Sequence, residues 1–319
     1  MPEGKGCGCS TQMLVGTLVL LLVLFVVSFI SGALGASFLG DLGMPSFLSV
    51  PKPHPQIPAE EVFHLFGFPV TNTLVASWLT MLVLIGLFYA GTRKMKLIPG
   101  KLQNFMEMGV EMLLNFVEGV AGKENGRRFF PLIATIFLFV IMNAWLSLFP
   151  GFGTVLITGA EEEPVHLLRG ANTDINLPLT LALMSFIFVE YWGITSRGFR
   201  RYMSKFINLG GVFRSMGQIL KGKLRVGLSG LFSGAIDAFV GILEALSEVV
   251  RVVSFTFRLF GNMTAGEILV LLTLFLVPWV LPIPFYGLEM LVGFVQALIF
   301  AGLTLVFAIV AVAAEAEHG

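Results

Sequence analysis

The sequence predicts an all-α polytopic membrane protein with five or six membrane helices, including a long tilted helical hairpin, and one amphipathic interfacial helix. Its 319 residues are 56% hydrophobic and only 13% charged, and the mean hydropathy of +0.88 lies outside the range of soluble domains. Several apolar stretches reach the roughly 20 residues that a helix needs to cross a bilayer. Because lipid offers no hydrogen bonds to the backbone, these stretches are expected to be helices.

Six segments meet the length requirement for a membrane span. They are residues 13–38, 70–91, 129–149, 176–195, 236–279 and 285–313. Seven Lys and Arg residues fall between positions 92 and 128 and eight between 196 and 235, whereas the loops 39–69 and 150–175 contain only Lys52 and Arg169. By the positive-inside rule, the two basic loops and both termini are expected on the cytoplasmic side.

The first segment allows two interpretations. Small residues in GALGAS (32–37) resemble those that follow the apolar region of a signal peptide, but the apolar run is long for a signal peptide. This length favours a retained helix, which gives six spans, whereas cleavage would give five spans and an N-terminus on the outside. We therefore treat residues 1–69 as an N-terminal part, with this apolar helix and a Pro-rich outer loop, and residues 70–319 as the membrane domain.

Residues 101–121 predict an amphipathic helix between the second and third spans. At helical spacing, Asn104, Glu107, Glu111 and Glu118 share one arc, and Phe105, Met112, Leu113, Phe116 and Val120 lie opposite. The polar face is acidic, whereas interfacial helices usually carry a basic one. We expect this helix at the cytoplasmic surface, where its polar face is either a partner surface or simply solvated.

The fifth segment is too long for an ordinary span. Between Asp237 and Phe275 it contains no proline, and at 1.5 Å per residue such a helix approaches about 60 Å, roughly twice the hydrocarbon thickness. It must therefore tilt, bend or lie partly flat. Pro278, Pro282 and Pro284 then predict a tight turn into the sixth segment, which completes a helical hairpin.

Polar residues inside this hairpin indicate a function. At 100° per residue, one stripe of the fifth segment contains Glu244, Glu248, Arg251, Arg258 and Asn262, while Glu267 points elsewhere, and one face of the sixth contains Glu289, Gly293, Gln296 and Phe300. An arginine at the centre of a membrane helix costs about 2.5–3.5 kcal/mol on insertion scales and cannot lose its proton. Isolated polar residues can simply join helices. This many, with both signs of charge, favour an ion pathway.

The expected topology places Glu244 and Glu248 toward the cytoplasm and Glu267 and Glu289 toward the outside. Arg258 lies between the two groups. A fixed cation at this position would interrupt a continuous pore and leave two half-channels.

Several strings resemble, in order, subunit a of bacterial F-type ATP synthase, over roughly residues 70–317. They are PGKLQNFMEMGVE (99–111), PLIATIFLFVIMNAWLSLFPG (131–151), TDINLPLTLAL (173–183), RLFGNMTAGE (258–267), LEMLVGFVQALIFAGLTLVF (288–307) and the charged C-terminal AEAEHG, with Glu244 14 residues before Arg258. The resemblance implies the ion-conducting stator subunit of the Fo sector, multi-pass in the bacterial cell inner (plasma) membrane. Its implied partners are the c-ring subunits, b-type peripheral stalk subunits and membrane lipid, with no cofactor and no nucleic acid.

The resemblance also implies roles for individual residues. Arg258 matches the essential charge that separates the half-channels and attracts a ring carboxylate. The outer pathway would include Asn262, Glu267, Glu289 and Gln296, with Asp174 and Asn176 near its mouth, and the inner pathway Glu244, which Glu248 would join. Glu289 stands where many bacterial relatives have histidine. Glu267 and Glu289 are therefore expected to titrate as a coupled pair. The resemblance implies that the conducted ion is H+, with Na+ as the alternative.

Other functions find less support in the sequence. Cys7 and Cys9 lack the second Cys pair or His cluster of a zinc site. Residues 217–224 match the nucleotide-binding pattern G-x-x-x-x-G-K but lack its final Ser/Thr and a preceding strand. A secondary transporter would also carry charges inside the membrane, but it usually shows paired repeats, which this sequence lacks.

Overall fold

The computed structural model describes residues 11–40, 52, 58–159, 164–206, 215 and 224–313. Its helices are α1 (Thr11–Ser31), α2 (Ala33–Leu39), α3 (Asn72–Thr92), α4 (Lys101–Ala121), α5 (Lys123–Ser147), α6 (Asn176–Arg197), α7 (Phe199–Phe206), α9 (Leu224–Leu276) and α10 (Pro282–Ala313). Six helices within the described ranges are long and apolar enough to cross a membrane. The predicted all-α polytopic membrane fold is therefore confirmed.

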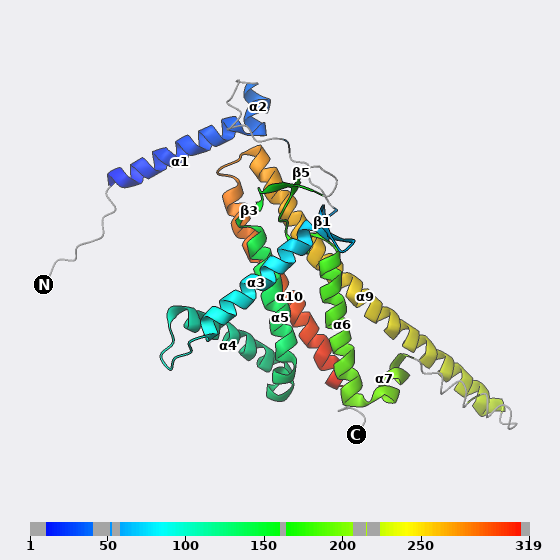
Figure 1. The fold of residues 1–319 in the computed structure, drawn as a ribbon. Coiled ribbons are helices and arrows are strands. Elements are labelled where there is room, and N and C mark those ends of the chain that lie inside the picture. Colours follow the sequence, from blue (N-terminus) through cyan, green and yellow to red (C-terminus); the bar gives the residue numbers. More distant parts are fainter. Residues whose placement is uncertain are drawn as a thin grey trace.

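The bundle is built around α5 and α10, which pack against each other (Figure 1). Helices α4 and α3 also pack on α5, and α6 and α9 pack on α10 and on each other. The core that joins them includes Phe129, Ile133, Val140, Leu259 and Leu305, all fully buried. Many other large apolar side chains of the spans are exposed, as expected for surfaces that face lipid.

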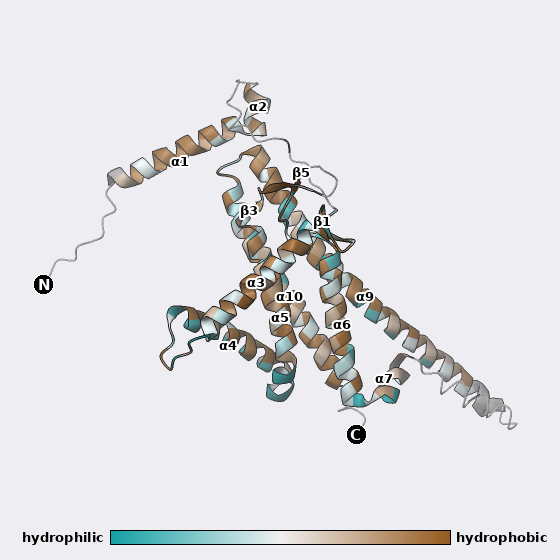
Figure 2. Ribbon diagram, in the orientation of Figure 1, coloured by the Kyte–Doolittle hydropathy of each residue, from teal (hydrophilic) through white to brown (hydrophobic). Residues whose placement is uncertain are grey.

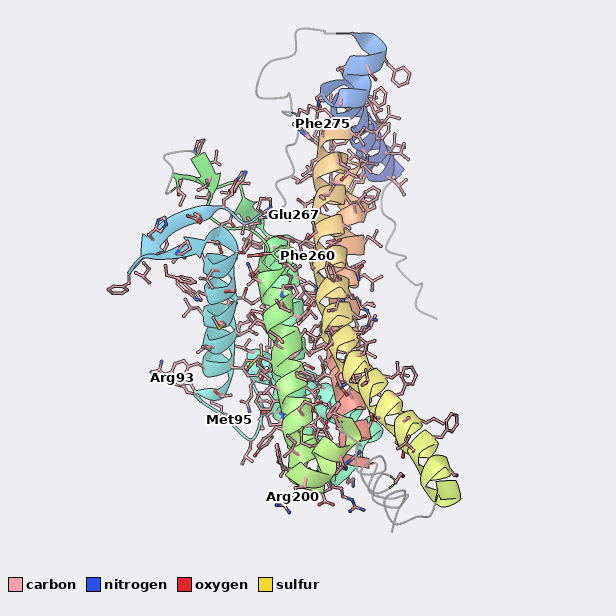
Figure 3. All side chains as sticks on the ribbon, turned by 90° about the vertical axis from the view of Figure 1, so that its right-hand side faces the viewer. Arg93, Met95, Arg200, Phe260, Glu267 and Phe275 are labelled. Carbon is pink, nitrogen blue, oxygen red and sulfur yellow. The ribbon has the colours of Figure 1, made fainter. Side chains whose placement is uncertain are left out.

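The bundle has two different ends. Arg93, Met95 and Arg200 lie at one end in Figure 3, which we call the basic end, and the hydrophilic colour of Figure 2 gathers there on α4, α5 and α7. The short strands of residues 61–71 and 156–166 lie at the other end (Figure 1), which we call the hairpin end after the β-hairpin of residues 61–71. The two ends correspond to the basic and non-basic loops of the sequence.

Helix α9 is the longest element and crosses the bundle obliquely (Figure 1). Its 53 residues correspond to about 80 Å at the usual helical rise. It begins at Leu224, twelve residues before the predicted start at 236, and no proline interrupts the chain between these positions. Pro282 begins α10, a position where proline is favoured because its missing N–H has no partner to lose.

The first segment was predicted as one helix over residues 13–38, but in the structure it forms two helices, α1 and α2. It breaks at Gly32, where a Cβ atom would overlap the carbonyl of Leu276. Next to this contact, the backbone N of Trp279 donates a hydrogen bond to Ser28 Oγ at 3.0 Å. The end of α1 thus packs on the turn between α9 and α10, and the rest of α1 projects away from the bundle (Figure 1).

The amphipathic helix over 101–121 is confirmed as α4. Leu113 and Val117 are buried against α5, whereas Phe105 and Met112 on the apolar side are exposed. Gly122 then turns the chain into α5 with a φ of 76°, which favours glycine.

The loops at the hairpin end contain strands that were not predicted. Strands β1 (Glu61–Leu65) and β2 (Phe68–Thr71) pair antiparallel, as do β4 (Leu156–Thr158) and β5 (Pro164–His166), while β3 (Pro150–Gly153) and the 3-10 turn η1 (Ala171–Thr173) complete the connection. Glu60 joins the two loops, because its Oε2 accepts hydrogen bonds from Asn72 Nδ2 and from the backbone N of His166.

Several sequence features lie outside the described residues. They are Cys7, Cys9, most of the Pro-rich loop, most of the nucleotide-like segment 217–224 and the C-terminal residues 314–319.

Candidate functional site

Polar side chains follow α9 and α10 through the bundle. On α9 they are Glu244, Glu248, Arg251, Arg258, Asn262 and Glu267, and on α10 they are Glu289 and Gln296. At 1.5 Å per residue, Arg258 lies about 21 Å along the helix axis from Glu244 and about 14 Å from Glu267. Arg258 thus separates polar residues toward the basic end from those toward the hairpin end.

Arg258 lies on the exposed face of α9. It follows the exposed Phe257, and the next residue, Leu259, is fully buried in the core. Among the described residues, no hydrogen-bond or ion-pair partner of Arg258 is found. An unpaired cation in this apolar environment is costly, so its side chain is suited to a negative partner outside the chain.

Asn262 and Gln296 connect α9 to α10 one helical turn beyond Arg258. Asn262 Nδ2 donates to Gln296 Oε1 at 2.7 Å. Gln296 is 2% exposed, and its Nε2 has no partner among the described groups. Buried polar atoms are usually satisfied by protein or water, so this amide has the capacity to bind a water molecule.

Glu267 lies toward the hairpin end (Figure 3) and forms an ion pair with Arg169. Arg169 Nε lies 3.3 Å from Glu267 Oε1, and Nη2 donates to Oε2 at the same distance. This contact joins the loop before η1 to α9. In the sequence, Arg169 stands out only as a rare basic residue of that loop.

Glu289 approaches the same turn of α9 from α10. Its residue is 8% exposed, and a Cβ atom on Gly266 would overlap its carboxylate. Glu267 and Glu289 therefore lie at the same turn of α9. The Glu267 carboxylate accepts hydrogen bonds from Arg169. Their predicted coupled titration stays a prediction.

Two acidic residues of α9 differ in their surroundings toward the basic end. Glu244 is half-buried, whereas Glu248 is buried and pairs with Arg251, whose Nη1 lies 2.6 Å from Glu248 Oε2. The Arg251 guanidinium also lies 3.7 Å from the centroid of the Phe307 ring, a cation–π contact.

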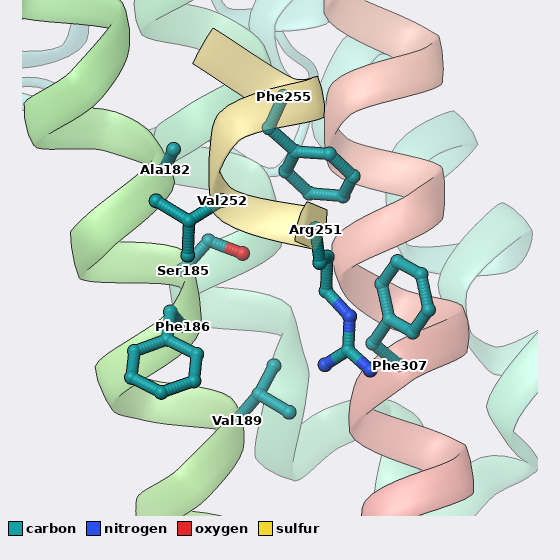
Figure 4. A pocket seen from close by; sticks show the side chains of 8 residues that line it. All are labelled: Ala182, Ser185, Phe186, Val189, Arg251, Val252, Phe255 and Phe307. Carbon is teal, nitrogen blue, oxygen red and sulfur yellow. The ribbon is translucent and has the colours of Figure 1, made fainter. Parts of the chain in front are cut away.

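Arg251 points into a small pocket between α6, α9 and α10 (Figure 4). Its lining residues are Ala182, Ser185, Phe186, Val189, Arg251, Val252, Phe255 and Phe307. Most of the side chains that line this pocket around the Arg251 guanidinium are apolar, which supports a role for Arg251 in packing. The shared stripe predicted from the sequence thus contains two arginines in unlike environments.

Asp174 and Asn176 lie together where α6 begins. Asp174 Oδ1 accepts hydrogen bonds from the backbone N and from Nδ2 of Asn176 at 3.2 and 3.1 Å. Asp174 Oδ2 accepts a hydrogen bond from Thr73 Oγ1 at 2.9 Å. The Asp174 carboxylate therefore also ties α3 to α6.

A buried polar chain near η1 was not predicted. Asn143 Nδ2 donates to Thr80 Oγ1, and Asn143 Oδ1 accepts from the backbone N of Asn172. Both side-chain polar atoms of Asn172 are buried without a partner among the described residues. Asparagine inside an apolar span is the signal that could have pointed to Asn143.

No group of three or more His, Cys, Asp or Glu side chains in the described ranges is arranged to hold a metal ion. The chemistry of the site is instead that of carboxylates, amides and fixed guanidinium groups. Such groups can accept, pass on or repel a small cation.

Comparisons with known proteins place the chain in a family. A family model described as ATP synthase A chain matches residues 74–308. ATP synthase subunit a of Gloeobacter violaceus is 33% identical over 233 residues, which cover 73% of this chain and 80% of that protein. The proteins of the same description from Moorella thermoacetica and Campylobacter curvus are 29% identical over 247 residues and 32% over 256, covering 77% and 80% of this chain and 93% and 94% of theirs.

Proposed function

The chain belongs to the ATP synthase A chain family, and from this premise we propose that it conducts protons through two offset half-channels to and from carboxylates of a rotating c-ring. As a family member it is a membrane subunit of the F-type ATP synthase complex. The proposal adds a mechanism, in which proton flow drives rotation and thereby ATP synthesis. Its further partners would be b-type peripheral stalk subunits and lipid of the bacterial inner membrane.

The observation that carries the proposal is the exposed position of Arg258 on α9, without a described partner. A ring carboxylate passing at about 4 Å would be attracted by about 4 kcal/mol at an effective dielectric constant of 20. This is enough to favour release of its proton and still permits the ring to move on. The permanent charge of arginine would also keep cations from passing directly between the two half-channels.

The remaining residues divide between two routes. Asn262, Gln296, Glu289 and Glu267 support the route on the hairpin side, with Asp174 and Asn176 near its mouth. Glu244 supports the route on the basic side. The ion pair of Glu248 with Arg251 favours a lesser part in transfer for Glu248. Basic loops and the C-terminus would face the cytoplasm.

Replacing Arg258 by Ala tests this function. We expect proton pumping and ATP synthesis in vesicles containing the whole complex to fall by a factor of roughly 100 or more, because the ring carboxylate loses its counter-charge. The complex should still assemble, since Arg258 forms no hydrogen bond or ion pair with a described side chain. Arg93→Ala, which removes an exposed arginine at the end of α3, is the matched control. Normal coupling in Arg258→Ala would refute the proposal.

Sodium translocation by the same subunit is the alternative. Carboxylate-lined routes suit either ion, and selectivity depends on the ring, which is another chain. ATP-driven transport measured with and without sodium, and with an uncoupler, decides between them. Pumping that requires sodium and resists the uncoupler would favour Na+.

A further inference from the structure

Arg169 and Glu267 form a contact that the family assignment does not explain. The guanidinium uses all three nitrogens, because Nε and Nη2 contact the Glu267 carboxylate and Nη1 donates to the carbonyl of Pro58 at 3.1 Å. The Arg169 side chain is only 12% exposed, and that of Glu267 is 32% exposed. This pair is therefore more enclosed than an ordinary surface salt bridge, whose contribution is small.

The backbone around Arg169 is held on both sides. The carbonyl of Leu168 accepts a hydrogen bond from the backbone N of Gly153 at 3.0 Å. After Arg169, the Gly170 carbonyl accepts a hydrogen bond from Thr173 Oγ1, and η1 is buried against α3, α5 and α9. Arg169 thus projects from a fixed point, and its planar fork can set the direction of a carboxylate.

The contact also lies beside a second acid. Gly266, which precedes Glu267, packs against the Glu289 carboxylate. Two carboxylates around one helical turn repel each other when both are ionised. A guanidinium on the far side of Glu267 would draw this carboxylate toward the loop and away from Glu289.

We propose that Arg169 is a positioning residue that holds the Glu267 carboxylate at the mouth of the outer route, where it receives ions before Glu289 does. This inference rests on the proposed function. It adds a fixed loop cation to the α9 and α10 residues of the route. It also gives the Pro58 segment a role, since the Pro58 carbonyl occupies the third nitrogen of the guanidinium and fixes its orientation.

A double-mutant cycle on the whole complex in vesicles tests the proposal. Arg169→Gln should lower ATP synthesis and ATP-driven pumping about five- to thirtyfold, the range typical of coupled neighbours. In a Glu267→Gln background, the same change should have little further effect, because its target is already gone. Arg169→Lys should recover part of the rate, since it keeps the charge but loses the planar fork.

Controls separate positioning from folding and from the proposed function. The amount of assembled complex should be unchanged in Arg169→Gln, and Arg93→Gln should behave as the wild type. Wild-type transport in Arg169→Gln, or effects of Arg169→Gln and Glu267→Gln that simply multiply, would overturn the positioning role. Loss of assembled complex in Arg169→Gln without recovery in Arg169→Lys would assign Arg169 to folding and also overturn it. Transport by Arg258→Ala would instead refute the proposed function itself.

Discussion

At the scale of single residues, the two arginines of α9 show how differently one kind of charge can be accommodated. Arg251 has a carboxylate at 2.6 Å and an aromatic ring at 3.7 Å, so its charge is compensated within the chain. Arg258, two helical turns further on, is exposed on the outer face of the helix. The chain thus carries one arginine suited to packing and another suited to an external anion.

The close packing of Gly266 against the Glu289 carboxylate allows a mutational test. Gly266→Ala would push a methyl group into the Glu289 carboxylate, and such overpacking typically costs about 1–3 kcal/mol. We expect Glu289 to be displaced and ATP-driven pumping, followed with a pH-sensitive dye, to fall severalfold. Gly86→Ala in α3 is the matched control, because an added Cβ meets no atom within 4 Å there. Equal pumping by the two variants would contradict this placement of Glu289.

At the scale of elements, local patterns and long-range contacts differed in how well they could be predicted. The spans and α4 followed from apolar runs and helical period, which depend on neighbours in sequence. The break at Gly32 did not, and Gly32 packs there against the backbone of Leu276, far along the chain. The Arg169–Glu267 and Thr73–Asp174 contacts join residues 98 and 101 positions apart, and no periodicity reports such pairs.

The packing of α9 on α10 yields a stability prediction. Arg251→Ala would remove the guanidinium that lies 2.6 Å from the Glu248 carboxylate, whose side chain is 7% exposed, and would remove the contact with Phe307. Removal of one partner from a buried ion pair typically lowers the free energy of unfolding by about 3–5 kcal/mol. The temperature at which the purified complex loses this subunit on native gels should therefore fall clearly.

Two further variants serve as controls for the predicted loss of stability in Arg251→Ala. Arg93→Ala removes an exposed arginine and should leave the transition temperature unchanged. Replacing Arg251 and Glu248 together by Leu should recover much of the loss, because the buried carboxylate is removed together with the guanidinium. An Arg251→Ala complex as stable as Arg93→Ala would show that the pair does not hold α9 in place.

At the scale of the whole molecule, the two ends differ in both composition and structure. Arg93 and Arg200 lie at the basic end, where α4 and α7 also lie, and the strands lie at the other end (Figures 1 and 3). The same axis orders the polar residues of α9. The orientation of the chain in the membrane therefore decides which route of the site opens to which side.

Cysteine labelling tests this orientation. Phe66 lies at the exposed tip of the β1–β2 hairpin, and Arg200 lies at the basic end. With Cys7 and Cys9 replaced by Ser, a membrane-impermeant maleimide should label Phe66→Cys from outside the cell. It should reach Arg200→Cys only in inverted vesicles, since basic loops are retained on the cytoplasmic side. The reverse pattern would exchange the two routes.

The length of α9 has a consequence for how an ion would cross. Its membrane-spanning part, Ser229–Leu276, is about 72 Å long for a hydrocarbon layer of about 30 Å, so the helix must slope strongly if it stays within the membrane. Once the angle between the α9 axis and the membrane normal exceeds about 45°, two points on α9 differ more in lateral position than in depth. Under the proposed function, Glu244 and Glu267 would then mark entrances displaced along the membrane plane. The slope of one helix would set the arc through which a ring must carry each ion between loading and release.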